Sequence, residues 1–420
     1  MTTAKPPTQS EVQIALALGA ALLFFVVILN AVRSDVSSFD FAVFYTGGLI
    51  IHQGNASRLY DLAEQARIER QLFNREKLLI VNHPPFEALM FAAFARLSYI
   101  KAYVLWGAIN VCLWVFFQHL LRPHTLVPKN PYRYLLVCSL FFPLWTVLIL
   151  GQVAIVLLLL FSLTFVCLKR HRDFTAGIFL GLGLFKFPIV LPFALIFLLR
   201  GKWRVMGGFA AASSLLGVLS IVAVGPVGVR SYANLLIDIV RHPDNPAYRS
   251  MRAWNQMPTV KGVFATLLAG RVISGYIAVL TVAVSAVLVL FMAWRWRQED
   301  RNPASDSLGV MFAAALAVSI LVAQHMYAYD LTLLLLAILL VIGSPQWSQK
   351  SVQRMALISI IAFLYIPFVY ILLLRWNAMY ILGPVVAAFA LAVISLAQKT
   401  RREKCKGDNH RPEAVRAAPE

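Results

Sequence analysis

The chain has 420 residues, of which 60% are hydrophobic and only 14% are charged, a composition that excludes an ordinary soluble globular protein. Its formal net charge of +19 does not indicate a nucleic-acid partner, because the basic residues fall in short clusters between apolar runs of membrane-spanning length. We therefore predict a single polytopic membrane domain over residues 1–398. Residues 399–420 are predicted to form a basic, disordered cytoplasmic tail.

The first apolar run covers about residues 12–32 and is predicted to be a retained transmembrane helix, because it lacks the basic start and cleavage site of a signal peptide. Directly after it, Asp40 lies among aromatic and aliphatic neighbours at a membrane face. Burial raises a carboxyl pKa toward the range useful for proton transfer, so Asp40 is a candidate general base. Ser37 and Asp40 also have the spacing of a capping box. The sequence leaves both roles open.

The polar region that follows extends to about residue 83 and contains two predicted helices. The first covers residues 38–51, and the second opens at Asp61, which forms a second capping-box pattern with Glu64. Residues 84–98 are apolar but short for a span, so we predict a half-inserted or interfacial helix there.

Lys186 lies in the middle of hydrophobic sequence, beside the helix breaker Pro188. Broken helices at membrane depth are tolerated only where they line a cavity or are buried in protein, whereas a lysine near a helix end can also snorkel to the surface. Before this break, small residues spaced four apart in residues 176–183 favour close helix packing. A second polar loop is predicted over residues 225–271.

Alternating the crossings places every short basic cluster on one side, which is predicted to be cytoplasmic and to hold both termini. The same alternation places the 33–83 and 225–271 loops, the Gly151-Gln152 turn, Lys186 and His325 together on the extracytoplasmic side. The remaining apolar runs that enter this alternation are 102–121, 132–149, 152–168, 188–199, 205–224, 272–294, 307–323, 328–343, 353–374 and 379–397.

These side chains suggest either an enzyme or a carrier. Soluble-nucleotide chemistry is not predicted, because the chain has no glycine-rich phosphate loop, no H-E-x-x-H and no G-x-S-x-G. The alternative function is a transporter or flippase of a lipid-linked sugar or anionic lipid, in which Lys186 and the helix break would form a midplane site. Transporters usually show repeated halves, and no convincing internal repeat is visible here.

A set of short motifs occurs along the chain in a fixed order. They are D-F-x-x-F-Y from Asp40, Gly54, Tyr60-Asp61, His83-Pro84-Pro85, Gly151-Gln152, Ala176-Gly177 through Lys186, Asn255-Gln256, and His325 before Tyr329-Asp330-Leu331. In these motifs and their order the chain resembles the polyprenol-phosphate-mannose-dependent glycosyltransferases of carbohydrate-active family 87 (DUF2029-like), which belong to the GT-C superfamily.

The resemblance implies an all-α polytopic membrane protein with the GT-C fold. Such a fold has about 11–13 transmembrane or half-membrane helices and two long extracytoplasmic loops with amphipathic helices. It further implies a bacterial inner (plasma) membrane protein that works among membrane lipids. The donor would be a polyprenyl-phosphate-linked mannose, or a related hexose or pentose, and the acceptor a glycolipid or glycan. Transfer would invert the anomeric carbon, with no metal and no cofactor.

The residues and the resemblance together give a set of predicted site residues. The catalytic residues are Asp40 and His325, with Asp330 as a rival for the base. Cations are needed near the leaving phosphate more than a general acid is. The donor-phosphate cations are predicted to be Lys186, Arg252 and Lys261. The substrate-binding residues are predicted to be Tyr45, Tyr60, His83, Gln152, Asn255, Gln256, Tyr329 and Asp330.

Overall fold

The computed structural model describes residues 9–33, 39–73, 79–125, 131–242, 245, 247–248, 253–301, 307–348 and 352–408. Within these ranges the secondary structure is helical, without a strand. The α-helices are α1 (Gln9–Arg33), α2 (Phe41–His52), α3 (Leu62–Phe73), α4 (Pro85–Ala92), α5 (Tyr99–Leu121), α6 (Pro131–Ser139), α7 (Phe142–Leu150), α8 (Ala154–Lys169), α9 (Asp173–Leu182), α10 (Phe187–Leu199), α11 (Trp203–Arg241), α12 (Val260–Leu267), α13 (Ser274–Asp300), α14 (Leu308–Leu321), α15 (Leu334–Ile342), α16 (Val352–Leu364), α17 (Pro367–Arg375) and α18 (Leu382–Asp408). The short 3-10 helices that matter for the site are η3 (Phe94–Arg96), η5 (Gly183–Lys186), η7 (Trp254–Gln256) and η8 (Ala328–Leu333).

Several helical segments are long and apolar enough to cross a membrane, which makes the chain a multi-pass membrane protein. Among the described residues they are Ser10–Ala31, Tyr99–His124, Trp203–Arg241, Ser274–Asp300 and Met379–Ala397, and Asp173–Leu199 is also long and apolar enough but folds back at η5. A further span is formed if α16 and α17, bent by 60°, cross together. Shorter apolar helical segments, such as α8 and α14, fill the bundle between them. The predicted all-helical polytopic architecture is confirmed.

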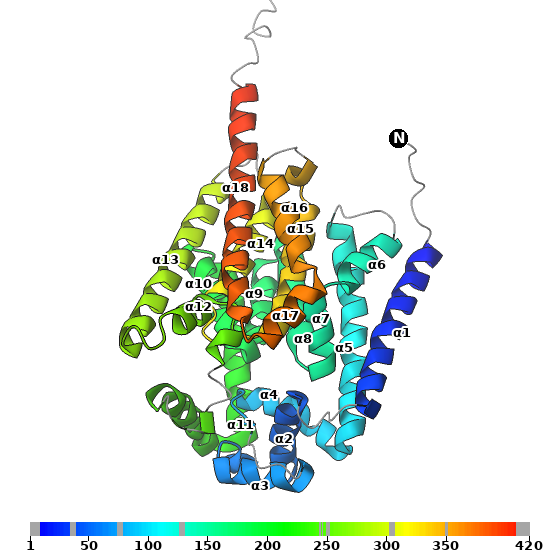
Figure 1. The fold of residues 1–420 in the computed structure, drawn as a ribbon, viewed down its shortest axis with the longest axis vertical. Coiled ribbons are helices and arrows are strands. Elements are labelled where there is room, and N and C mark those ends of the chain that lie inside the picture. Colours follow the sequence, from blue (N-terminus) through cyan, green and yellow to red (C-terminus); the bar gives the residue numbers. More distant parts are fainter. Residues whose placement is uncertain are drawn as a thin grey trace, which may run out of the picture.

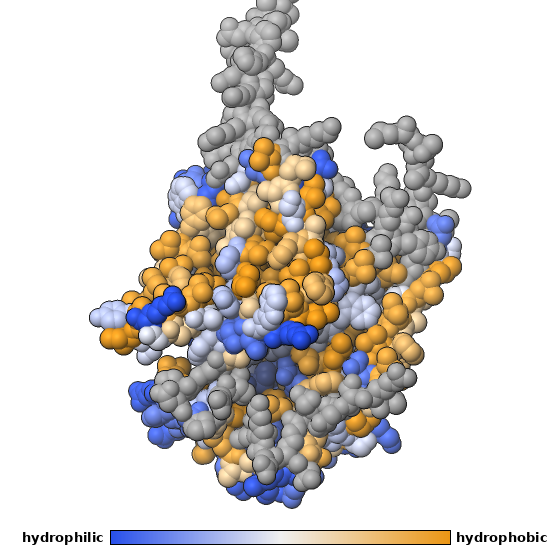
Figure 2. All heavy atoms as spheres, in the orientation of Figure 1, coloured by the Kyte–Doolittle hydropathy of each residue, from blue (hydrophilic) through white to orange (hydrophobic). Residues whose placement is uncertain are grey.

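The helices form a membrane bundle with a smaller layer at one end (Figure 1). The layer contains α2, α3, α4 and the C-terminal part of α11, whereas α1 begins and α18 ends at the opposite end of the molecule. Hydrophobic side chains cover most of the bundle in the view of Figure 2, and hydrophilic side chains gather on the outer end of the layer. The two ends of the described chain therefore lie on the side away from the layer. Helix α18 also continues to Asp408, so the helix passes the predicted domain boundary at residue 398.

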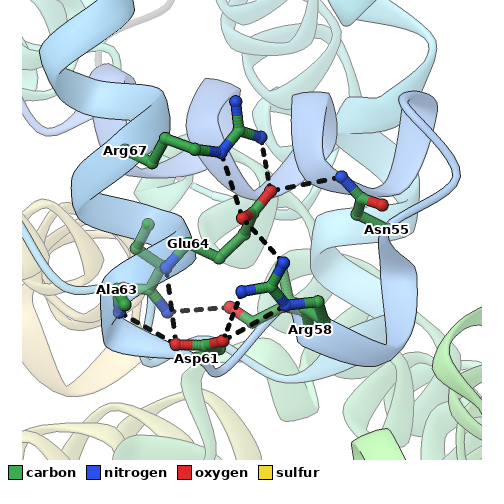
Figure 3. Close-up of polar contacts among 8 residues, drawn as sticks. Asn55, Arg58, Asp61, Ala63, Glu64 and Arg67 are labelled. Atoms are coloured by element: carbon green, nitrogen blue, oxygen red, sulfur yellow. Dashed lines mark hydrogen bonds and ion pairs between the residues drawn. The ribbon is translucent and has the colours of Figure 1, made fainter.

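The layer is ordered by a cluster of charges at the start of α3 (Figure 3). The Asp61 Oδ1 accepts hydrogen bonds from the backbone N–H groups of Ala63 at 2.9 Å and Glu64 at 3.4 Å. The predicted cap at Asp61 is confirmed. Glu64 does not complete the box, because its carboxylate instead binds Arg67 at 2.5 Å and Arg58 at 3.2 Å.

The span predicted to end near residue 224 kinks there, and the predicted 225–271 loop begins with the helical second half of α11. Gly225 has φ 72° and ψ 170°, a conformation that glycine adopts without a steric penalty, and Pro226 follows it. The chain therefore kinks and resumes a helix that reaches Arg241. This second half brings the Tyr232 ring to 4.9 Å from that of Tyr60 in the layer.

Helices α9 and α11 approach each other closely through glycines, as the small-residue pattern predicted. An added Cβ at Gly177 would lie 1.9 Å from the Val205 carbonyl oxygen, and one at Gly208 would lie 1.9 Å from that of Phe174. No side chain larger than hydrogen fits either contact without backbone movement.

The chain turns back on itself at η5. Arg200, after α10, interacts electrostatically with Asp173 at the start of α9. It also donates a bidentate pair of hydrogen bonds to Asp300, with its Nη2 2.8 Å from Oδ1 and its Nε 3.1 Å from Oδ2. Residues 188–199 therefore return toward the level of Asp173, as predicted. By contrast, 84–98 holds only α4 and η3, whose eight and three residues are too short to cross a membrane.

Candidate active site

Asp40 lies at the start of α2, where the layer meets the bundle. Its side chain makes no capping hydrogen bond, so the capping role left open by the sequence does not hold. Ser37, the other half of that pattern, lies outside the described residues. Instead, the Gln152 Nε2 donates a hydrogen bond of 2.6 Å to Asp40 Oδ2. A residue 112 positions away in the sequence thus holds the candidate base.

Gln152 belongs to a turn between α7 and α8 that fits tightly against α2. Gly151 has φ +66°, and an added Cβ there would lie 2.7 Å from the Phe41 Cβ. The Trp106 Nε1 donates to the Gly151 carbonyl oxygen at 2.9 Å, and Tyr103 Oη donates to that of Ile149 at 2.8 Å. These contacts fix the turn, so the amide of Gln152 is presented to Asp40 by a rigid support.

Lys186 ends η5 and makes a buried ion pair with Asp330. The two side chains are 12% and 1% exposed, and Nζ lies 3.2 Å from Oδ1. The ammonium also lies 5.0 Å from the centre of the Tyr329 ring. Asp330 Oδ2 accepts the backbone N–H of Tyr327 at 3.2 Å and so caps η8. Lys186 does not snorkel, and Asp330 is occupied by structural contacts.

The charges around Asp40 act on one another. Burial raises the pKa of the Asp40 carboxyl, and the Gln152 hydrogen bond and the charges of Lys186 and His83 partly offset that rise. Burial, together with Lys186 and other cations, lowers the pKa of His325 to about 3. His325 is therefore a neutral imidazole at neutral pH, which can donate or accept a hydrogen bond.

His83 is held by an acidic residue that the sequence reasoning missed. Its Nδ1 lies 2.9 Å from Glu87 Oε2, and the Glu87 side chain is 1% exposed. The imidazole also packs against Phe44, with ring centres 4.7 Å apart. The available signal was a lone carboxylate inside the apolar stretch 84–98, because an acid at membrane depth is a functional candidate by default.

The hydroxyls of two predicted substrate-binding tyrosines are bonded to the backbone. Tyr45 Oη donates to the Leu97 carbonyl oxygen and Tyr60 Oη to that of His83, each at 2.7 Å. Both hydroxyls serve the fold in this structure, Tyr60 by fixing the backbone of His83. Their binding roles stay predictions.

The predicted residues of the second loop lie on η7 and α12. Lys261 Nζ lies 4.4 Å from the centre of the Trp254 ring, and burial lowers the pKa of Lys261. Its positive charge also interacts with His325. Asn255 lies in η7, and Gln256 Nε2 donates to Asn377 Oδ1 at 2.6 Å. Arg252 lies outside the described residues.

The structure brings one group of the predicted site residues together. Electrostatic or hydrogen-bond contact joins Asp40, His83, Gln152, Lys186, Lys261, His325, Tyr329 and Asp330. In the view of Figure 2, hydrophilic side chains line a recess between the bundle and the layer. Such a site, partly shielded from water and at membrane level, suits a substrate with an apolar tail and a polar head. Over the described ranges, no group of three or more His, Cys, Asp and Glu side chains could hold a metal.

Comparison with known proteins identifies the family. The family model described as Glycosyltransferase family 87 matches residues 82–322, more than half of the chain. The matched segment contains His83, Gln152 and Lys186. The comparisons with curated proteins and with solved structures find no match. The all-helical, multi-pass architecture is the one expected of a GT-C-type transferase, and the transporter alternative is not favoured. The chain belongs to glycosyltransferase family 87, and it is a membrane glycosyltransferase.

Proposed function

We propose that the protein transfers a sugar from a polyprenyl-phosphate carrier to a hydroxyl of a glycolipid or glycan, by a single inverting displacement without a metal. The observation that carries this proposal is the buried Asp40 carboxylate. It accepts a hydrogen bond from Gln152 and interacts electrostatically with Lys186 and His83. A carboxyl whose pKa is raised by burial is suited to take a proton from a hydroxyl. The transferred sugar is mannose or a related hexose or pentose.

In the proposed reaction, the acceptor oxygen forms a bond to the anomeric carbon as the bond from that carbon to the phosphate oxygen breaks. Asp40 takes the proton of the acceptor hydroxyl, and the polyprenyl phosphate leaves with the bonding electron pair. One displacement inverts the anomeric centre. Retention would require a free nucleophilic carboxylate, and the other carboxylate whose charge acts on Asp40, that of Asp330, is held by Lys186 and the Tyr327 N–H.

Two lysines supply positive charge for the leaving phosphate, and their different surroundings favour different roles. Lys186 is already paired with Asp330, whereas Lys261 has no ion-pair partner among the described residues and rests on Trp254. A partly desolvated ammonium gains from a phosphate partner. Lys261 therefore binds the phosphate directly, and Lys186 stabilises the negative charge that develops on it. Arg252 is retained as a third candidate.

The donor is tested with the purified protein in proteoliposomes that contain a membrane lipid extract as the source of acceptor. We expect radiolabel to move from polyprenyl-phosphate-mannose into lipid or glycan, with the same rate in the presence of EDTA and with the inverted anomer in the product. Polyprenyl-phosphate-linked arabinose and GDP-mannose are the comparison donors. Transfer from GDP-mannose alone would contradict the proposed lipid-linked donor, and loss of transfer in EDTA would contradict metal independence.

We further propose that the layer faces the extracytoplasmic side of a bacterial inner membrane and that both termini are cytoplasmic. The support is that the short basic segment of residues 169–172 follows α8, whose sixteen residues start beside the Gln152–Asp40 contact and end at Lys169. In a background whose cysteines are replaced, Ser57→Cys should react with an impermeant maleimide in intact cells. Arg172→Cys, also exposed, should react only after permeabilisation. The reverse labelling would contradict the proposed orientation.

A further inference from the structure

The amide of Gln152 has a partner at only one end. Its Nε2 donates to Asp40 Oδ2 at 2.6 Å, whereas its Oε1 is buried and has no hydrogen-bond partner among the described residues. The residue as a whole is 2% exposed. Buried polar atoms are nearly always paired, and leaving one unpaired is costly. A hydroxyl group of a bound molecule can supply the missing donor to Oε1.

The orientation of the amide follows from the chemistry of its partner. An ionised carboxylate only accepts hydrogen bonds, so the Gln152 nitrogen and not its oxygen faces Asp40. The oxygen must then point to another group that donates. The backbone of Gln152 cannot turn to change this, because its N–H donates to the Val147 carbonyl oxygen at 2.9 Å and Gly151 is held by Trp106.

We propose that Gln152 aligns the reacting groups, with its Nε2 holding the Asp40 carboxylate in position to take the proton, and its Oε1 accepting a hydrogen bond from a second hydroxyl of the acceptor. This inference rests on the proposed function and adds a substrate class. An acceptor that meets both groups carries two neighbouring hydroxyls, as a sugar or another polyol does, whereas a simple alcohol does not. Gln152 is then a positioning residue for Asp40 as well as a binding residue.

The titration of Asp40 gives a readout that a merely structural residue would leave unchanged. The charged and titratable groups facing Asp40 are Lys186 on η5, His83 before α4, and Asp330, Tyr329 and Tyr327 at η8. A hydrogen bond to the charged carboxylate favours that form, so the Gln152 contact lowers the Asp40 pKa. The base must be ionised, and kcat/KM therefore falls as the pH falls through this pKa. Without the amide, this acid limb moves to higher pH.

The experiment compares Gln152→Met and Gln152→Glu with Thr146→Val, a control on the neighbouring helix α7 whose hydroxyl donates to the Pro143 carbonyl oxygen. We expect Gln152→Met to lower kcat about tenfold to a hundredfold. The acid limb of the pH profile of kcat/KM should move to higher pH. Acceptor KM should rise, and donor KM should stay unchanged. Gln152→Glu should move the acid limb to still higher pH, because two adjacent carboxylates share a proton and the pKa of one of them rises. Thr146→Val should match the wild type in all of these.

A second readout does not depend on turnover. The infrared carbonyl band of protonated Asp40, assigned by its loss in Asp40→Asn, should titrate at higher pH in Gln152→Met than in the wild type. The proposal would be overturned if, in Gln152→Met, the infrared band and the acid limb both titrate at the same pH as in the wild type. An unchanged KM for the acceptor would also overturn it. If the wild type transfers no lipid-linked sugar, the proposed function fails, and the infrared titration still decides whether Gln152 positions Asp40.

Discussion

Replacing Asp40 by asparagine is expected to lower turnover about a hundredfold or more, because the amide cannot accept the proton of the acceptor hydroxyl. Folding and donor binding should stay close to those of the wild type, since the side chain makes no capping hydrogen bond and asparagine keeps its shape. Sugar transfer from a radiolabelled polyprenyl-phosphate sugar measures turnover, and thermal unfolding in detergent measures stability.

The matched control is Asp61→Asn, the same chemical change in the same layer. Asp61 caps α3 and pairs with Arg58 at 2.8 Å, in the charge cluster at the outer end of the layer. This variant should lose no more than about 1 kcal/mol of stability and keep its activity, because asparagine caps a helix as well as aspartate does and only the exposed ion pair with Arg58 is lost. If Asp40→Asn retains more than about a tenth of wild-type activity, the base is another group, and Asp330→Asn and His325→Ala then identify which one.

The sequence predicted which side chains meet better than it predicted how they meet. Asp40, Lys186 and His325 stand out because ionisable groups are costly in apolar sequence and therefore point to function. Alternation of the spans then placed them at one level. Their partners could not be predicted, because the contacts of Asp40 with Gln152 and of Lys186 with Asp330 join distant segments, and only tertiary packing fixes such pairs.

Sequence patterns that predict structure from a few neighbouring residues failed where a distant segment of the chain made the deciding contact. The spacing of Ser37 and Asp40 allowed a helix cap, but the Asp40 carboxylate accepts a hydrogen bond from Gln152 instead. A Gly-Pro pair normally ends a helix, yet α11 resumes after Gly225 because its second half packs in the layer, with Tyr232 against Tyr60. The spacing at Asp61 worked because a cap depends only on its own first turn.

Lys186→Met is expected to destabilise the protein by about 3–5 kcal/mol, because it leaves the Asp330 carboxylate buried without its cation. Both side chains of the pair are largely buried. The matched control is Lys202→Met. Lys202 pairs with Asp300 at 3.4 Å, but the two side chains are 37% and 30% exposed, and Arg200 also binds Asp300. This exposed pair should contribute no more than about 1 kcal/mol.

The double variant Lys186→Met with Asp330→Asn separates the structural role of the lysine from its proposed catalytic role. Asparagine removes the buried negative charge and keeps an oxygen for the Tyr327 N–H, so the double variant should regain most of the stability lost in Lys186→Met. The coupling between the two sites is measured by a double-mutant cycle of thermal unfolding. Turnover should stay low in the stable double variant, because the ammonium near Asp40 is lost and Lys261 alone remains to stabilise the charge that develops on the leaving phosphate. If activity returns together with stability, the only task of Lys186 is to neutralise Asp330, and the charge that stabilises the phosphate comes from Lys261.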